Sequence, residues 1–179
     1  MTQAANTYAK ALYLLAAEEG LDRQILTELT VLDQAFSREP DFLRLLAAPN
    51  LPKAERCGII DDSFRDQVHI YVLNFMKILT EQGYVRQFGD CCKAYRARYN
   101  EDHGILNVQA VTAVALTGEQ TARLTQKLAK HTGKTIELTN LVDPTVLGGV
   151  RLDYDGKRVD GTVKNRLDTV RDLLKNTVL

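Results

Sequence analysis

The spacing of apolar residues changes once along this chain of 179 residues, at Gly104. Before Gly104 apolar residues recur every three or four positions, as in amphipathic helices, and after it short β-type runs appear. The charge changes at the same place. Residues 1–103 hold 12 Lys+Arg and 15 Asp+Glu, a balance of −3, whereas residues 104–179 hold 11 and 8, a balance of +3. We therefore predict two small domains, a helical one over 1–104 and an α/β one over 105–179.

The first part is expected to form a bundle of six helices. Tyr8, Leu12 and Leu15 share one stripe of the first helix, and Asp22 is placed to cap the second. Pro40 and Pro52 suit the starts of two short helices. A long helix is predicted from about 66 to 82, before Gly83, and the last helix has an apolar face containing Val85, Phe88, Cys92, Tyr95 and Tyr99.

The second part is expected to have the order βαββα. A Val- and Ala-rich run over 107–115 predicts a strand, and the sequence 117–120 (TGEQ) is a capping box for a helix that ends at Gly133. Ile136 and Leu138 alternate with polar residues in a second strand, and Asp155-Gly156 is a hairpin turn between two more. A final helix is predicted to present Val163, Leu167, Val170, Leu174 and Val178 on one face.

Composition excludes several classes of protein. The zero net charge argues against a general nucleic-acid binder, because binding to phosphates requires an excess of basic residues. No window approaches the ~18 apolar residues of a membrane span, and the N-terminus has neither a signal peptide nor an Arg-rich transit peptide. Three cysteines, two of them adjacent, fit a reducing compartment without disulfides.

Motifs for catalysis, metals or cofactors are lacking in the sequence. The three histidines are isolated, so no metal site is predicted, and Cys91 and Cys92 are expected to be buried. Gly148-Gly149 lacks the pattern of a phosphate loop and is interpreted as a bend where another backbone approaches. We therefore expect no catalytic residue and no cofactor.

The segment 68–79 is more apolar than a surface helix requires, since only His69, Asn74 and Lys77 among its twelve residues are polar. Two interpretations remain open on this pattern. The helix lies centrally in the bundle, or it packs one face inward and keeps another for a partner. The Ala-rich first helix favours the second interpretation, because small side chains leave a shallow groove that can hold an amphipathic helix.

Three motifs carry a resemblance to a known family. They are residues 8–12 (YAKAL), residues 74–79 (NFMKIL) followed by 81–83 (EQG), and residues 142–150 (VDPTVLGGV) with 159–167 (VDGTVKNRL). Together they resemble the delta subunit of bacterial and chloroplast rotary ATP synthases, which is related to the mitochondrial oligomycin sensitivity-conferring protein. The resemblance covers nearly the whole chain. Thr162, Lys164 and Asn165 stand where this family more often has Ser, Arg and Gly.

The resemblance implies a non-catalytic stator subunit of a proton-translocating ATP synthase, present in one copy per complex. Residues 1–104 would bind the catalytic head by holding the N-terminal helix of an alpha subunit, and residues 105–179 would bind the peripheral-stalk b subunits. The implied groove consists of Tyr8, Ala11, Leu12, Leu15, Phe75, Ile78 and Leu79. The implied structural residues of the second domain are Asp143, Gly148, Gly149, Asp160, Gly161 and Arg166.

The same resemblance implies a peripheral location on the cytoplasmic face of a bacterial plasma membrane, reached only through the complex. Two other classes of protein stay open at this stage. A regulatory adaptor that binds an unrelated amphipathic helix would have the same groove. An enzyme would need a catalytic group assembled from both domains, for which the sequence offers no motif.

Overall fold

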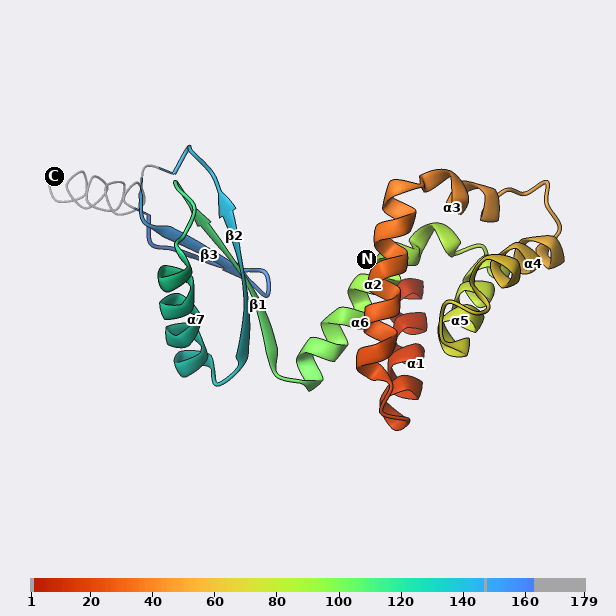
Figure 1. The fold of residues 1–179 in the computed structure, drawn as a ribbon, viewed down its shortest axis with the longest axis horizontal. Helices are drawn as coiled ribbons and strands as arrows, with labels where there is room; N and C mark the ends of the chain where they lie inside the picture. The colour runs from red at the N-terminus through yellow and green to blue at the C-terminus, as the bar shows by residue number, and fades with distance from the viewer. Residues whose placement is uncertain (1, 147, 163–179) are drawn as a thin grey trace, which may run out of the picture. The chain divides into compact units, whose positions relative to one another are not determined.

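A computed structural model describes residues 2–146 and 148–162 (Figure 1). The chain divides into two compact units, Met1–Asp102 and a second that begins at His103. The first unit is helical and the second is a small α/β unit, as the sequence predicts.

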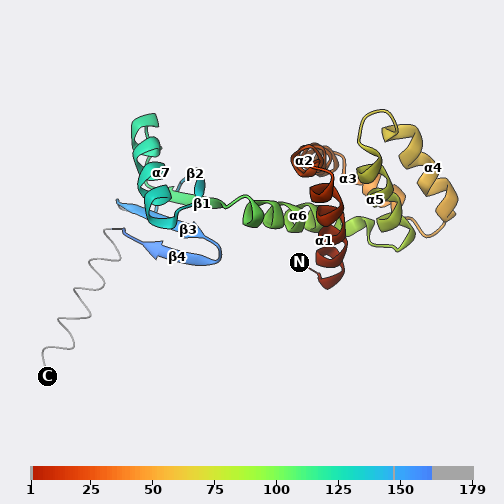
Figure 2. The same ribbon diagram turned by 90° about the horizontal axis from the view of Figure 1, so that it is seen from below.

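Six α-helices and one short 3-10 helix make up the described part of the first unit. They are α1 (Gln3–Glu18), α2 (Asp22–Arg38), α3 (Pro40–Leu46), α4 (Lys53–Phe64), α5 (Ile70–Glu81), η1 (Val85–Gln87) and α6 (Phe88–Asp102). One apolar core joins them, and its largest fully buried side chains include Tyr95, Phe88 and Ile25. Figures 1 and 2 show α1 running beside α6 and α2.

Two helix starts differ from the prediction. The predicted helix over 66–82 is shorter, because α5 begins at Ile70, and His69 is its N-cap in an extended conformation. The Nδ1 atom of His69 accepts a hydrogen bond from the Tyr71 amide at 3.3 Å, and the Glu28 carboxylate accepts one from the His69 amide at 2.7 Å. Asp22 does not cap α2 but is its first residue, and the N-cap position is occupied by Leu21 without a side-chain hydrogen bond.

The second unit is built on a four-stranded sheet in the order β2-β1-β3-β4. Its described elements are β1 (Ile105–Thr112), α7 (Gly118–Thr132), β2 (Thr135–Val142), β3 (Val150–Tyr154) and β4 (Lys157–Asp160). β1 is parallel to β2 and antiparallel to β3, and β3 is antiparallel to β4. The first strand starts two residues earlier than predicted and ends three residues earlier. The described order is β-α-β-β-β, so the predicted order βαββα lacks one strand: β3 and β4 are the separate arms of the Asp155-Gly156 hairpin. The predicted final helix lies outside the described residues.

Local sequence explains these elements. The capping box of α7 is present, since the Thr117 side chain accepts from the Gln120 amide while the Gln120 side chain accepts from the Thr117 amide. The turn between β3 and β4 has positive φ at both Asp155 and Gly156, as a two-residue type I′ hairpin requires. Alternate residues of the sheet, among them Leu106, Val108 and Ile136, face α7 and form a second apolar core.

Candidate functional site

Helices α1 and α5 lie side by side and run in opposite directions. At one end, the Tyr71 hydroxyl near the start of α5 donates a 2.6 Å hydrogen bond to Glu19 Oε1, just after α1. At the other end, the ring of Tyr8 in α1 lies 5.9 Å from the ring of Tyr84, which follows α5. We call the surface between these two contacts the α1–α5 seam.

Only some of the groove residues predicted from the sequence are exposed at the seam. Leu12, Phe75 and Leu79 are buried in the core of the unit, so they offer no surface to a partner. Tyr8 is half-buried, and Ala11 is exposed. Leu15 and Ile78 are the two large apolar side chains of the set that reach solvent, at 41% and 44% exposure.

Two further residues of α5 lie in the same strip, the half-buried Tyr71 and the exposed Asn74. Tyr71, Asn74 and Ile78 follow one another at the spacing i, i+3, i+7 on α5, and Tyr8, Ala11 and Leu15 follow the same spacing on α1. Each helix thus presents one stripe to the seam. Tyr71 and Asn74 are not among the groove residues predicted from the sequence, although the shared spacing of the two stripes could have identified them.

The far side of α5 is held by α4. Lys77 Nζ lies 2.6 Å from Asp61 Oδ1, and the hydrogen bond from Lys77 lowers the pKa of that carboxyl. Cys57 of α4 contacts Glu81 Oε1 at 3.7 Å. Together with Glu28 of α2, which accepts from the His69 amide at the N-cap, α4 holds α5 in place while Ile78 is exposed.

The glycines predicted as structural residues lie where two backbone segments meet. Gly149 has a φ of +84°, and a Cβ built on it would lie 2.6 Å from the carbonyl oxygen of Gly161. The Gly161 amide donates a 3.1 Å hydrogen bond to the carbonyl of Val150. Gly148 has a φ of 147° in the same bend. A residue with a Cβ atom at position 149 would therefore clash with the backbone of Gly161.

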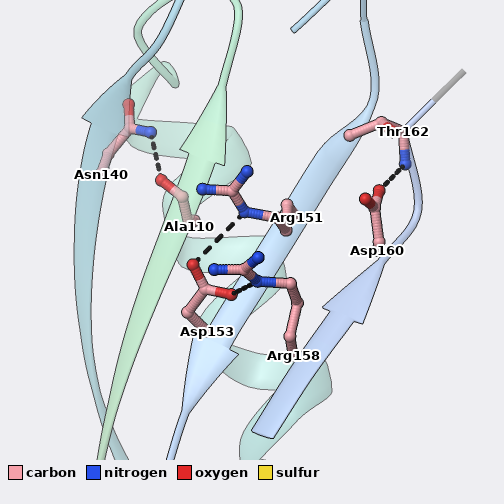
Figure 3. Close-up of polar contacts among 7 residues, drawn as sticks. All are labelled: Ala110, Asn140, Arg151, Asp153, Arg158, Asp160 and Thr162. Carbon is pink, nitrogen blue, oxygen red and sulfur yellow. Dashed lines mark hydrogen bonds and ion pairs between the residues drawn. The ribbon is translucent and has the colours of Figure 1, made fainter. Parts of the chain in front are cut away.

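The two aspartates among the predicted structural residues stabilise turns. Asp143 accepts hydrogen bonds from the amide and hydroxyl of Thr145 at 2.9 and 2.7 Å, and these bonds lower the pKa of Asp143. Asp160 accepts one from the Thr162 amide at 2.9 Å (Figure 3), and the bonding to Thr162 lowers the pKa of Asp160. Arg166 lies outside the described residues.

Oppositely charged residues face one another across β3 and β4. Arg151 is opposite Asp160, and Asp153 is opposite Arg158. Asp153 accepts from Arg158 Nε at 2.8 Å and from Arg151 Nε at 3.3 Å, as Figure 3 shows. The bond from Arg158 is the main reason why the pKa of Asp153 is lowered. This arrangement favours one register of the hairpin, since a shift of two residues would place Arg151 opposite Arg158.

An amide side chain joins β2 to β1 at the same end of the sheet. Asn140 Nδ2 donates to the carbonyl of Ala110 (Figure 3) and to Thr112 Oγ1, both at 2.9 Å. Asn140 Oδ1 accepts from the Leu116 amide at 2.8 Å. The side chain thereby joins Thr112, at the end of β1, to Leu116, directly before the N-cap of α7.

Nucleophilic and metal-ligating groups are not arranged for chemistry in the described part of the chain. Cys91 and Cys92 are buried, and burial raises the pKa of the Cys91 thiol to about 11, so both favour the unreactive thiol form. Among residues 2–146 and 148–162, no group of three or more His, Cys, Asp or Glu side chains could hold a metal ion. None of the helices in those ranges has the length and hydropathy needed to cross a bilayer.

The fold thus defines a two-unit protein in which a helical unit with an exposed apolar seam precedes a small mixed-sheet unit. Residues 4–174 match the family model described as ATP synthase delta (OSCP) subunit, and the chain belongs to that family. The resemblance found in the sequence is therefore confirmed.

Individual relatives agree with this assignment. The chain is 35% identical over 172 residues to ATP synthase subunit delta of Alkaliphilus oremlandii, with 96% of each chain covered. It is 33% identical over 171 residues to ATP synthase subunit delta of Lactobacillus gasseri, covering 95% of this chain and 93% of that protein. A chain in the mitochondrial ATP synthase hexamer of Toxoplasma gondii has the same fold, with a TM-score of 0.75 at 16% identity over 97% of this chain and 98% of that one.

Proposed function

We propose that this protein is a non-catalytic stator subunit of a rotary, proton-translocating ATP synthase. Its helical unit, arranged as a six-helix bundle, binds the N-terminal helix of an alpha subunit of the catalytic head. Its second unit binds the b subunits of the peripheral stalk, so that the head does not turn with the rotor. One copy serves each complex. The observation that carries the proposal is the α1–α5 seam, with Leu15 and Ile78 exposed between two braced helices.

An apolar seam suits a contact that must hold the catalytic head against torque. A subunit that resists torque needs a slow dissociation rate, and burial of apolar surface supplies this better than exposed ion pairs worth about 0–1 kcal/mol each. An amphipathic helix that buries Leu15 and Ile78 would remove from water two side chains that the free protein leaves half-exposed.

The second unit offers a separate apolar surface for the stalk. Val114, Leu141 and Val142 are exposed, Val114 at 73%. Leu141 and Val142 end the edge strand β2 beside the end of β1 and point to opposite faces of the sheet, and Val114 follows β1 by two residues. Exposed apolar side chains therefore lie on both faces at this corner of the sheet.

The location follows from the proposed assembly. The protein lies at the cytoplasmic face of a bacterial plasma membrane, and the complex alone holds it there. It takes part in ATP synthesis and hydrogen ion transport by anchoring the head, and it needs no cofactor of its own.

A calorimetric titration of the full chain with a peptide of the alpha subunit's N-terminal helix tests the proposal. We expect one-to-one binding. Ile78→Asp should weaken it about tenfold or more, because a carboxylate would be buried against an apolar helix face. Val31→Asp is the matched control, since Val31 of α2 is 60% exposed but does not belong to the seam stripes. Equal loss in both variants, or none in Ile78→Asp, would contradict the seam as the head-binding site.

The remaining alternative is a helix-binding adaptor unrelated to ATP synthase. A pull-down of the tagged protein from its native membranes tests this alternative. It would be favoured if no synthase subunits were recovered although the seam still binds amphipathic peptides. Family membership argues against it.

A further inference from the structure

We propose that the α1–α5 seam selects a helix with basic residues on its flank, and that Glu18 and Glu19 are the specificity-determining residues. This inference rests on the proposed helix-binding function of the seam. It adds the chemistry and the charge of the partner segment, which apolar burial alone leaves open.

The carboxylates are placed beside the apolar strip. Glu18 is three residues after Leu15 and seven after Ala11, so it continues the exposed stripe of α1. Glu19 is four residues after Leu15 and reaches across to α5 through its hydrogen bond with the Tyr71 hydroxyl. The end of the seam at the C-terminus of α1 therefore presents two carboxylates next to exposed apolar surface.

The cations of the two helices do not offset this charge. Within α1 and α5, which the structure describes completely, the cationic side chains are Lys10 and Lys77. Lys10 is two residues from Tyr8 and so points away from the stripe that Tyr8 shares with Leu15. Lys77 forms its ion pair with Asp61 on the side of α4.

The helix dipole strengthens the negative potential at this end. The carbonyl groups at the C-terminus of α1 carry partial negative charge, and Glu18 and Glu19 add two formal charges beside them. Neither carboxylate is offset by a basic residue in the last turn of α1. A Lys or Arg on the flank of a bound helix would relieve this repulsion, whereas Asp or Glu there would increase it.

Glu19 is also held in position before any partner arrives. The Tyr71 bond fixes one carboxylate oxygen, and the pKa of Tyr71 is raised mainly by that bond. Glu19 is exposed, so its carboxylate can also accept from a donor of the partner. An anionic lipid surface does not fit such a rim, because its phosphates would meet two carboxylates.

The test uses the full chain and two synthetic amphipathic helical peptides with the same apolar face. One peptide carries Lys along its flanks and the other carries Glu. We expect the Lys peptide to bind about five- to tenfold more tightly at about 50 mM salt, with the difference shrinking at about 500 mM salt because exposed charges are screened.

The double variant Glu18→Gln/Glu19→Gln should remove most of the preference for the Lys peptide. The amide introduced at position 19 keeps a side-chain carbonyl that can accept from Tyr71, so the brace is retained. The control is Glu39→Gln, which removes an exposed carboxylate at the C-cap of α2, outside both seam stripes.

The outcomes distinguish a failure of the proposed charge selection from a failure of the proposed helix binding. If both peptides bind equally and Ile78→Asp weakens both, the seam binds helices and the proposed charge selection is wrong. If the preference persists in the double variant, other residues set it and Glu18 and Glu19 do not. If neither peptide binds the folded chain, both proposals fail.

Discussion

Tyr13 of α1 donates a 2.7 Å hydrogen bond from its hydroxyl to Oδ2 of Asp102, the last residue of α6. The ring of Tyr13 is buried and packs edge-on against the ring of Tyr95 at 5.4 Å. Burial, followed by the bond to Asp102, raises the pKa of Tyr13, so the phenol stays protonated and remains a donor. A carboxylate at a helix C-terminus opposes the helix dipole, and the bond from Tyr13 compensates for that repulsion.

Removal of this bond should destabilise the helical unit. We expect Tyr13→Phe to lower the free energy of unfolding by about 1.5–3 kcal/mol, the usual range for a hydrogen bond to a charged group. Asp102→Asn should cost less, because the amide still accepts from Tyr13 and the repulsion by the dipole disappears. Urea unfolding followed by far-UV circular dichroism measures both. A larger loss in Asp102→Asn would contradict this account.

Truncation of two neighbouring residues of α5 should lower stability by very different amounts. Leu79 is fully buried, so Leu79→Ala should cost about 2–5 kcal/mol of stability through the cavity it leaves. Ile78→Ala should change stability by about 0.5 kcal/mol or less, because Ile78 faces solvent. The same urea unfolding experiment compares them. Similar costs would mean that Ile78 is packed and not available to a partner.

Alanine substitutions at Gly149 and Gly133 should distinguish the cost of a steric clash from the cost of backbone strain. Both have positive φ, +84° and +69°, but a Cβ at Gly133 meets nothing within 4 Å, whereas one at Gly149 meets the Gly161 carbonyl at 2.6 Å. Gly133→Ala should therefore cost about 1 kcal/mol from strain alone. Gly149→Ala should cost clearly more, because the contact with Gly161 must open. Amide hydrogen exchange in α7 and β2 measures the change at Gly133, and exchange in β3 and β4 measures the change at Gly149. Equal costs would refute the close approach.

The charge on Asp153 should stabilise the β3–β4 hairpin in a pH-dependent way. The pKa of Asp153 is lowered in the folded protein, mainly by Arg158, and lies below the value of about 3.9 expected for an unfolded chain. Its contribution is therefore fully present above about pH 5 and is lost as the pH falls through the folded pKa. Asp153→Asn should be less stable than the natural protein at about pH 7, with the difference shrinking below about pH 4. Exchange rates of the β4 amides at both pH values measure this, and a difference independent of pH would show that the charge is not responsible.

Local signals in the sequence predict much of this fold. The proline that begins α3, the capping box of α7 and the Asp155-Gly156 turn each act within a few residues, so they could be located without knowledge of distant contacts. The start of α5 could not be located in this way. It depends on Glu28, which is 41 residues away in sequence and accepts the His69 amide hydrogen bond that replaces a helical one.

The candidate site was harder to predict than the fold for a similar reason. Apolar periodicity identifies Leu12, Leu15, Ile78 and Leu79 equally well, because it reports hydrophobicity and not the side on which a neighbouring helix lies. The packing of α4 and α2 against α5 decides that Leu79 is buried and Ile78 is exposed. Two adjacent residues of similar size thus receive different roles from tertiary contacts alone.

The two contacts at the ends of the α1–α5 seam also affect how much conformational entropy is lost on binding. Because Tyr71–Glu19 closes one end and Tyr8–Tyr84 the other, the two helices cannot separate or slide without losing both contacts. The spacing of the stripes is thus set before a ligand arrives. Preorganisation of this kind places most of the ordering entropy on the incoming segment, so a ligand that is already helical in isolation gains most of the available affinity.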